Sequence, residues 1–429
     1  MTATSNSNSV TAAYHRPMES TVQVAHLGAD RLFAGTTAGR VGHSRHRALT
    51  GAAPHRDRTW LIDAAHRVGL RGRGGAGFPV ADKLAAVAPG RRTHVLVNGS
   101  ESDPTSSKDK ALLCLAPHHV VDGALLVAAA LQTDRITIVV PDPVAADSLT
   151  AACDERGDAA RYRIVTRTGH SVVSGEVHAL IEALDGRPAV PTGRRVSASR
   201  RGIGKAPTFA SNVETFAQLG LLAGLGVDRF AELGFGPERG TMLMTTGGAV
   251  PFRAVAEVPV GTRLSRLTGP TREPVLLGGY HGAWTTELDI PLDHRFLHDR
   301  HLGRGVGSVV VLPTETCALG EIARVVQWSA RRSAGQCGPC VFGLDALAAD
   351  MTALARGERR DPDAIRRRLG VMAGRGSCNH PDGVARFAAS ALTRFGHEVD
   401  AHLRGGCGRR ILGVLPIPDD PDDPIGGPR

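Results

Sequence analysis

The fold is decided by residues 93–140, where "THVLVN" (93–98) and "RITIVV" (135–140) flank the longer run "HHVVDGALLVAAALQ" (118–132). The two short apolar runs predict buried strands, and the run between them has the length of a helix. A further helix and the run "RYRIVTRT" (161–168) follow. Strands that alternate with helices are typical of an α/β domain with a largely parallel sheet.

The pattern changes twice after this domain. Residues 241–313 contain short β-type runs separated by turns, which predicts a small β-rich domain. From Glu315 to about Arg404 the spacing becomes helical, and the breaks fall at "SAGQCGPC" (333–340), "ARGERRDP" (355–362) and "GRGSCNHPDG" (374–383). We therefore expect a helical bundle whose loops carry cysteines.

Length and charge limit the functions that the chain can have. Its 429 residues suffice for about three domains, and its net charge of +9 comes mostly from arginines spread along the chain. Aromatic residues make up only 4%, and no zinc-finger spacing occurs. These features argue against nucleic acid as a partner and favour anionic small molecules.

The sequence also predicts where the chain resides. No apolar run reaches the roughly 18 residues of a membrane span, and the polar N-terminus lacks the apolar core of a signal peptide. We expect a cytoplasmic chain, with disordered tails at the N-terminus and at "PIPDDPDDPIGGPR" (416–429).

A glycine-rich loop, "GLRGRGGAGFPVADKL" (69–84), is the strongest signal for a phosphate site. Its glycines allow the backbone to approach a ligand, and the helix after Pro79 offers free N–H groups to an anion. Arg71, Arg73 and Lys83 add positive charge. The loop matches neither a Walker motif nor a dinucleotide fingerprint, and a flexible surface loop is the alternative.

Three further segments place polar or small residues next to a predicted strand or helix. They are "VNGSESDPTSSKD" (97–109), "SGEVHALIEAL" (174–184) and "APTFASNVETFAQL" (206–219). Ligands usually bind at the carboxyl ends of strands in an open α/β sheet, although capped turns would give the same pattern.

The seven cysteines are too scattered, and odd in number, for a disulfide framework. Cys114, Cys153 and Cys317 each lie in apolar or helical surroundings, where a small buried side chain is expected. The remaining thiols, Cys337, Cys340, Cys378 and Cys407, are candidate metal ligands. For the closely spaced Cys337 and Cys340, a redox dithiol and a turn with two inert thiols are the alternatives.

These motifs together resemble a known family. "GLRGRGGAGFP", "NGSESDP" followed by "KD", "GE", "SNVET", "GGYHG" and "GQCGPC" occur in the order found in NADH-oxidising flavoprotein subunits of respiratory NADH:quinone oxidoreductase and of related hydrogenases and formate dehydrogenases. The resemblance implies a multidomain α/β protein, with segments as follows: a disordered tail (1–27), a Rossmann-like FMN and NADH domain (28–238), a ubiquitin-like β-grasp domain (239–314), a helical iron-sulfur domain (315–405) and a flexible tail (406–429).

The resemblance also implies the residues that hold FMN. They fall on the glycine loop, on the loop after the first strand and on two later loops: Gly72, Arg73, Gly74, Gly75, Lys83, Asn98, Ser100, Glu101, Gly175, Glu176, Ala210, Ser211, Asn212 and Thr215. Ser100 replaces an acidic residue of the family, and Ser211 replaces an asparagine. Glu101 is expected next to the flavin ring, where it acts in catalysis by tuning orientation and charge.

The resemblance also implies an NADH-binding face, in which several of the family's residues are replaced. Phe78 is kept where the family stacks the adenine, Asp103 shortens a glutamate, and Arg194 or Arg195 stands in for a lysine. Val177 replaces a second glutamate, and the aromatic residue of "GRPAVPTGRRVSASRRG" (186–202) is missing.

The family pattern for the cluster contains four cysteines, of which this chain keeps Cys337, Cys340 and Cys378. The first position is Ala334. We therefore expect either a [4Fe-4S] cluster with a substitute ligand or a [3Fe-4S] cluster. Cys407 is a candidate for the substitute.

The implied activity is NAD(P)H oxidation through FMN and the cluster to a redox partner. The partner would be a ferredoxin or a thioredoxin-like [2Fe-2S] subunit, and a membrane redox complex could hold the chain peripherally. An assembly scaffold and a flavin reductase without a cluster are the alternatives.

Overall fold

The computed structural model describes residues 23–51, 54–166, 172–193, 196–358 and 361–418. One part is built on a parallel sheet of four strands in the order β4-β3-β2-β5. The strands are β2 (His94–Asn98), β3 (Ile136–Val139), β4 (Tyr162–Val165) and β5 (Thr208–Asn212). The α/β expectation is confirmed, while β5 is a strand that the sequence pattern did not reveal.

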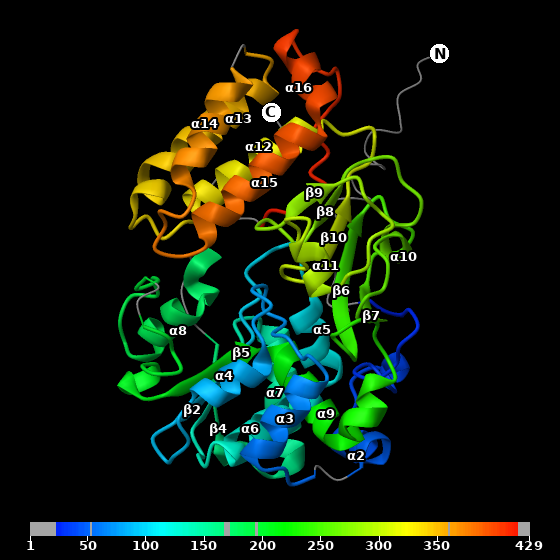
Figure 1. Cartoon of the computed structure of the whole chain (residues 1–429), viewed down its shortest axis with the longest axis vertical. Helices are drawn as coiled ribbons and strands as arrows, with labels where there is room; N and C mark the ends of the chain where they lie inside the picture. Colours follow the sequence, from blue (N-terminus) through cyan, green and yellow to red (C-terminus); the bar gives the residue numbers. More distant parts are fainter. Residues whose placement is uncertain (1–22, 52–53, 167–171, 194–195, 359–360, 419–429) are drawn as a thin grey trace.

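Helices pack around this sheet, as the lower part of Figure 1 shows. They are α2 (His43–Thr50), α3 (Arg58–Arg67), α4 (Val80–Ala86), α5 (Lys108–Leu115), α6 (Pro117–Ala130), α7 (Pro143–Arg156), α8 (Val177–Leu184) and α9 (Val213–Ala231), with 3-10 turns η1 (Thr36–Ala38), η2 (Ala159–Arg161), η3 (Val172–Gly175) and η4 (Ile203–Lys205). Helices α6 and α9 approach closely, because a Cβ at Gly123 would lie 1.8 Å from the carbonyl oxygen of Phe216. Helix α9 also packs against strands β2 and β5.

A second, mixed sheet has six strands in the order β1-β7-β6-β10-β8-β9. They are β1 (Val24–His26), β6 (Thr241–Gly248), β7 (Val255–Pro259), β8 (Val275–Leu277), β9 (Ala283–Thr285) and β10 (Ser308–Val311), with short helices α10 (Ser265–Thr268) and α11 (His294–His298) between them. The expected tail over residues 1–27 is wrong at its end, because β1 pairs in parallel with β7. Residues 1–22 lie outside the described part.

The helical region lies at the top of Figure 1. It contains α12 (Ala318–Arg331), the π-helix η5 (Pro339–Leu344), α13 (Asp345–Ala355), α14 (Pro362–Met372), α15 (His380–Arg394) and α16 (Gly396–Leu403). Three of the breaks fall at the predicted loops, and a further break, between α15 and α16 at residue 395, was not predicted.

The segment after α16 is not the flexible tail that we expected from residue 406. Its backbone N–H groups at residues 412–415 donate to the buried carboxylate of Glu321, and Leu415 is fully buried. A buried carboxylate with four such donors fixes the segment against α12.

Membrane-spanning potential is confined to one bent pair. Among the described residues no single helix is long and apolar enough to cross a bilayer, and α5 with α6 would qualify only together, across a bend of 94°.

Candidate flavin and iron-sulfur site

The carboxyl ends of β2 and β5 form the floor of the candidate flavin site. Asn98 and Asn212 are paired in register at these ends. The side chain of Asn98 donates to the carbonyl oxygen of Gly175 at 2.8 Å and accepts the N–H of Ser100 at 3.0 Å. Asn212 caps α9 by accepting the N–H of Glu214. The loops at Asn98, Gly175 and Asn212 therefore converge, as the sequence predicted.

The glycine loop packs over the start of α9. The N–H of Gly72 donates to the carbonyl oxygen of Phe78 at 2.9 Å, and the N–H of Arg73 donates to Oγ1 of Thr215 at 3.0 Å. A Cβ at Gly74 would lie 3.2 Å from that of Asn212. Gly75 has a φ of 109°, which favours glycine. The loop thus reaches the same sheet edge as the other segments.

The charge of Arg73 does not face a ligand, which corrects the sequence expectation. Its buried guanidinium donates to Glu238 and to the carbonyl oxygen of Thr241. Nζ of Lys83 donates to the carbonyl oxygen of Ala210 at 3.0 Å, and burial lowers the pKa of this lysine. The groups of the glycine loop that remain for a ligand are therefore its backbone groups, and the guanidinium of Arg73 is already paired.

A buried charge network lies next to the glycine loop, and the sequence did not predict it. Nζ of Lys108 lies 3.1 Å from Glu214 and 2.7 Å from Asp109, and Glu238 joins Arg73 to Arg304. The only available signals were the "KD" behind "NGSESDP" and the glutamate of "SNVET". Charges this deeply buried need partners, so the network stabilises the floor of the site.

Glu238 gives a stability prediction. Glu238→Ala should lower the free energy of unfolding by about 3 kcal/mol, because it leaves two buried guanidinium groups without their shared carboxylate. Glu232→Ala is the control, since its exposed ion pair with Arg31 spans 4.0 Å and should be worth less than about 1 kcal/mol. Urea unfolding of both variants measures the difference, and equal midpoints would contradict the assignment.

Glu101 lies at the N-terminus of α5. Its carboxylate accepts the hydroxyl of Ser106 at 2.5 Å and the N–H groups of Asp109 and Lys110 at 3.2 and 3.1 Å. Burial, followed by the charge of Asp109, raises the pKa of Glu101 to about 7. This carboxyl group therefore changes its charge near neutral pH, which suits a group that tunes a cofactor.

Asp103 joins the two sheets. One carboxylate oxygen accepts the N–H and hydroxyl of Thr105, and the other accepts the N–H of Tyr280 at 2.7 Å. Burial raises its pKa. Since both carboxylate oxygens already have partners, the main role of Asp103 is structural: it connects the loop after β2 to the backbone at Tyr280.

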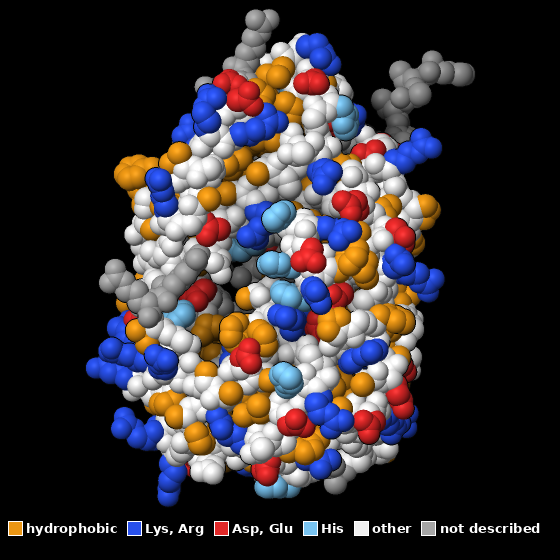
Figure 2. All heavy atoms as spheres, in the orientation of Figure 1, with side chains coloured by type: hydrophobic (Ala, Val, Ile, Leu, Met, Phe, Trp, Pro, Cys, Tyr) orange, Lys and Arg blue, Asp and Glu red, His pale blue; other side chains and the backbone are white. Residues whose placement is uncertain are grey.

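The predicted nicotinamide face is only partly described. The ring of Phe78 is 52% exposed, an unusual position for a large aromatic side chain and one that leaves its face open to stacking. Glu176 caps α8 by accepting the N–H groups of His178 and Ala179. Arg195 lies outside the described residues, as does Arg194. Figure 2 shows a hollow between the α/β part and the helical region, with histidine side chains beside it.

The residues around the sheet edge fit a flavin. The hydroxyl of Ser100 is buried and has no hydrogen-bond partner among the described residues. A Cβ at Gly175 would lie 3.0 Å from that of Ser100, so a glycine at this position lets the two loops approach closely. Ser211 and Ala210 are buried on β5 beside it. A buried hydroxyl without a partner, next to glycine loops, could form a hydrogen bond with a polar ring system such as that of a flavin.

Three cysteines of the helical region come together as predicted. Cys337 and Cys340 are hydrogen-bonded to each other, and Cys378 and the hydroxyl of Ser333 also act on Cys340. Burial raises the pKa of Cys340 to about 12, and Cys337 adds to the shift. Burial also acts to raise the pKa of Cys337, but hydrogen bonds from Ser377 and Cys340 outweigh it, so that pKa is lowered. Three thiols gathered in this way fit an iron-sulfur cluster.

The cysteine loop touches the α/β part. The side-chain amide of Gln336, next to Cys337, donates to the carbonyl oxygen of Pro191. Cys407 does not belong to this loop, because it lies beside Cys317 near α16, which corrects its assignment as the substitute ligand. Cys317 is likewise no isolated core thiol.

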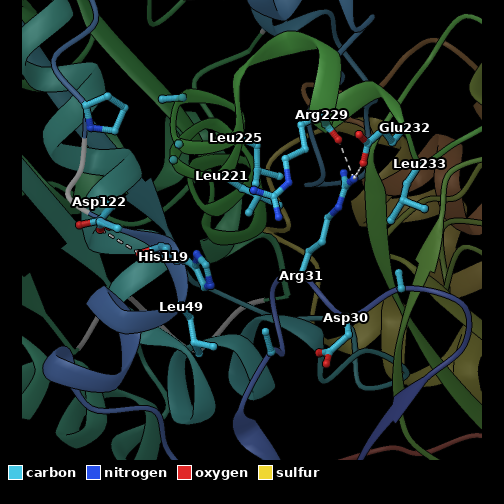
Figure 3. Close-up of a pocket in the computed structure, with 18 of the residues that line it drawn as sticks. Asp30, Arg31, Leu49, His119, Asp122, Leu221, Leu225, Arg229, Glu232 and Leu233 are labelled. Atoms are coloured by element: carbon cyan, nitrogen blue, oxygen red, sulfur yellow. Dashed lines mark hydrogen bonds and ion pairs between the residues drawn. The ribbon is translucent and has the colours of Figure 1, made fainter.

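A cavity of about 680 Å³ lies elsewhere, between Arg31, Asp122 of α6 and Leu221 of α9 (Figure 3). None of the residues predicted to bind flavin or nucleotide lines it. We place neither cofactor there.

Family models match two stretches of the chain. Residues 65–220 match the Nuo51 FMN-binding domain, and residues 320–402 match the NADH-ubiquinone oxidoreductase-F iron-sulfur binding region. The chain is therefore similar to NADH-oxidising flavoprotein subunits in both its flavin region and its iron-sulfur region. The first stretch contains all of the loops at the sheet edge, and the second contains the three clustered cysteines.

Individual relatives of this flavoprotein family agree with the two matches. The chain is 28% identical to an NADH-quinone oxidoreductase subunit of Mycobacterium tuberculosis over 81% of its length and 85% of the relative. It is 26% identical to the NADP-reducing hydrogenase subunit HndC of Solidesulfovibrio fructosivorans, over 80% of this chain and 76% of the relative.

A solved structure of an NAD+-reducing [NiFe]-hydrogenase in the H2-reduced state has the same fold. It superposes with a TM-score of 0.74 at 26% identity, over 81% of this chain and 63% of the hydrogenase chain. The mixed α/β architecture of this family is thus shared with that hydrogenase chain.

Proposed function

We propose that this chain is an FMN-dependent NAD(P)H oxidoreductase that passes electrons through an iron-sulfur cluster to a protein partner. The observation that carries the proposal is the meeting of loops at the ends of β2 and β5, where the buried hydroxyl of Ser100 has no hydrogen-bond partner among the described residues and Gly74 and Gly175 let the loops approach closely. The names of the relatives, subunits of quinone oxidoreductases and hydrogenases, support it.

The flavin would be held by four loops that meet at one edge. Backbone groups at Gly72, Gly74 and Gly75 face it from one side, and Asn98, Ser100 and Gly175 from another. When bound, FMN accepts a hydride and releases electrons one at a time. The chain contributes orientation, since Asn98 is fixed by two hydrogen bonds, and a nearby charge, since Glu101 ionises around neutral pH.

The nucleotide would stack on Phe78, the exposed aromatic side chain of the glycine loop. The carboxylates of Glu176 and Asp103 already accept backbone N–H groups, which leaves them less able to bind a nucleotide. We therefore assign most of the nucleotide contact to Phe78 and expect weak binding.

The cluster would be held by Cys337, Cys340 and Cys378. The contact from Gln336 to Pro191 ties the cysteine loop to the α/β part, which favours electron transfer between the two cofactors. In this proposal residues 28–238 form the Rossmann-like FMN domain, 239–314 the β-grasp domain and 315–405 the iron-sulfur domain. The relatives are subunits, so a ferredoxin or a [2Fe-2S] subunit of a larger complex is the proposed partner.

Anaerobic stopped-flow mixing of the FMN-loaded protein with NADH or NADPH tests the activity. We expect flavin absorbance to bleach with at least one nucleotide, and Phe78→Ala to raise the apparent Kd about tenfold through lost stacking. Phe235→Ala is the matched control, because Phe235 is also exposed, at 65%, but lies outside the predicted flavin and nucleotide loops.

Two results would redirect the proposal. Absence of bleaching with either nucleotide would contradict the oxidoreductase and favour an assembly scaffold. Bleaching in a protein that contains no iron after anaerobic reconstitution would identify a flavin reductase.

A further inference from the structure

Four side chains with metal-binding atoms converge where α12 begins and α16 ends. They are Cys317, Glu398, His402 and Cys407, and one ligand atom of each lies within 4.8 Å of those of the others. The first three are at least 97% buried. Among the described residues, this is the one group of its kind, and it is separate from the cysteines of the iron-sulfur site.

The spacing of the atoms suits a tetrahedral ion. Sγ of Cys317 lies 3.3 Å from Nε2 of His402. In a zinc site with Zn–S near about 2.3 Å and Zn–N near about 2.0 Å, a sulfur and a nitrogen lie roughly 3.5 Å apart. The thiols of Cys317 and Cys407 are also within hydrogen-bonding distance of each other. The ligand atoms of Cys317, His402 and Cys407 would therefore have to move little to bind one ion.

Local structure explains why these residues meet. Cys317 is the N-cap of α12, and Glu398 and His402 stand four residues apart on one face of α16. Cys407 lies in "RGGCGRR", where Gly406 has a φ of 132° and turns the chain back. The N–H of Cys317 donates to the carbonyl oxygen of Arg410 at 2.8 Å, which holds the loop in place.

The electrostatics also fit a divalent cation. Two thiolates and the carboxylate of Glu398 carry three negative charges, which a divalent ion and the guanidinium of Arg409 would balance. Nη1 of Arg409 lies 2.6 Å from Oε1 of Glu398, and the N–H of Ala318 lies 3.0 Å from Oε2. Such contacts orient a ligating carboxylate.

We propose that Cys317, His402, Cys407 and Glu398 bind one Zn²⁺ ion that fastens the segment after α16 to the start of α12. Sulfur, nitrogen and oxygen ligands in a closed set of four are typical of structural zinc. The ion has no redox chemistry, so this site acts on the stability of the iron-sulfur region and not on electron transfer.

Metal analysis of the full chain, purified without chelators, is the first test. We expect about one zinc per chain in the wild type, retained in Cys337→Ser and lost in Cys407→Ser. Iron should behave in the opposite way, being lost in Cys337→Ser and retained in Cys407→Ser. Cys114→Ser is the matched control and should keep both metals, because Cys114 lies on α5, far along the chain from either group.

Cobalt provides a readout that does not depend on a variant folding. Replacement of zinc by Co²⁺ in the wild type should give intense visible bands and a thiolate charge-transfer band, the signature of tetrahedral sulfur ligation. Glu398→Gln should shift these bands, since it changes one ligand.

Two outcomes would overturn the proposal. One is a Cys317–Cys407 disulfide, detected as a mass loss of two hydrogens in the peptide map without reductant. The other is a protein with free thiols that contains no zinc and gives no thiolate band when titrated with Co²⁺.

Discussion

Gly74→Glu should weaken FMN binding by about 100-fold or more while leaving the fold intact. A Cβ at this position would lie 3.2 Å from that of Asn212, so a glutamate side chain is crowded against the end of β5, where the loops of the proposed flavin site meet. There it would occupy part of that site and bring a carboxylate towards the flavin phosphate. Overpacking costs about 1–3 kcal/mol, and charge repulsion adds to this, so a loss of two orders of magnitude is expected.

Gly370→Glu is the matched control for this prediction. It makes the same substitution at a helical glycine of α14 that has no atom within 4 Å of its Cβ position and no positive φ. Flavin fluorescence titration of both apoproteins gives the Kd values, and circular dichroism checks the fold. If Gly74→Glu bound FMN as tightly as Gly370→Glu, the glycine loop would not be the flavin site.

Local patterns in the sequence were enough to place the parallel sheet. The runs at 93–98 and 135–140 are apolar and of strand length, and they form β2 and β3, although two helices, α5 and α6, lie between them where the sequence indicated one. Strand β5 escaped detection because "TFASN" passes directly into α9, so the helix-capping signal of Asn212 dominates. Strand β1 escaped because its three residues are stabilised by β7, more than 200 positions away.

The same limit explains what the sequence missed in the sites. The residue types of the flavin loops could be recognised, but the direction of the Arg73 side chain depends on Glu238, 165 residues further along the chain. The sequence indicated a buried core thiol for Cys317 and a substitute cluster ligand for Cys407, because the contact that joins them is set by the packing of α16 against α12. Long-range pairing of charges and thiols has no period that a sequence pattern can show.

Ala334→Cys should convert the cluster of this protein from an oxygen-labile form into a stable [4Fe-4S] centre. Cys337, Cys340 and Cys378 supply three thiolates, and Ala334 stands where the family places a fourth. An iron without a thiolate must take another ligand or leave, which gives a [3Fe-4S] centre. Cys407 lies beside Cys317, so the hydroxyl of Ser333, which contacts Cys340, is the substitute ligand that we test.

Electron paramagnetic resonance of the air-exposed and dithionite-reduced proteins measures this conversion. The oxidised wild type should show a [3Fe-4S] signal, and Ala334→Cys should lose that signal and show a [4Fe-4S] signal only after reduction. Ser333→Ala should lower the iron retained by the wild type but leave Ala334→Cys unaffected, because the added thiolate makes the hydroxyl unnecessary. Ala85→Cys controls for an extra thiol, since this exposed residue of α4 lies outside the cysteine loops. A lack of iron in both the wild type and Ala334→Cys after anaerobic reconstitution would show that Cys337, Cys340 and Cys378 do not bind a cluster in this chain.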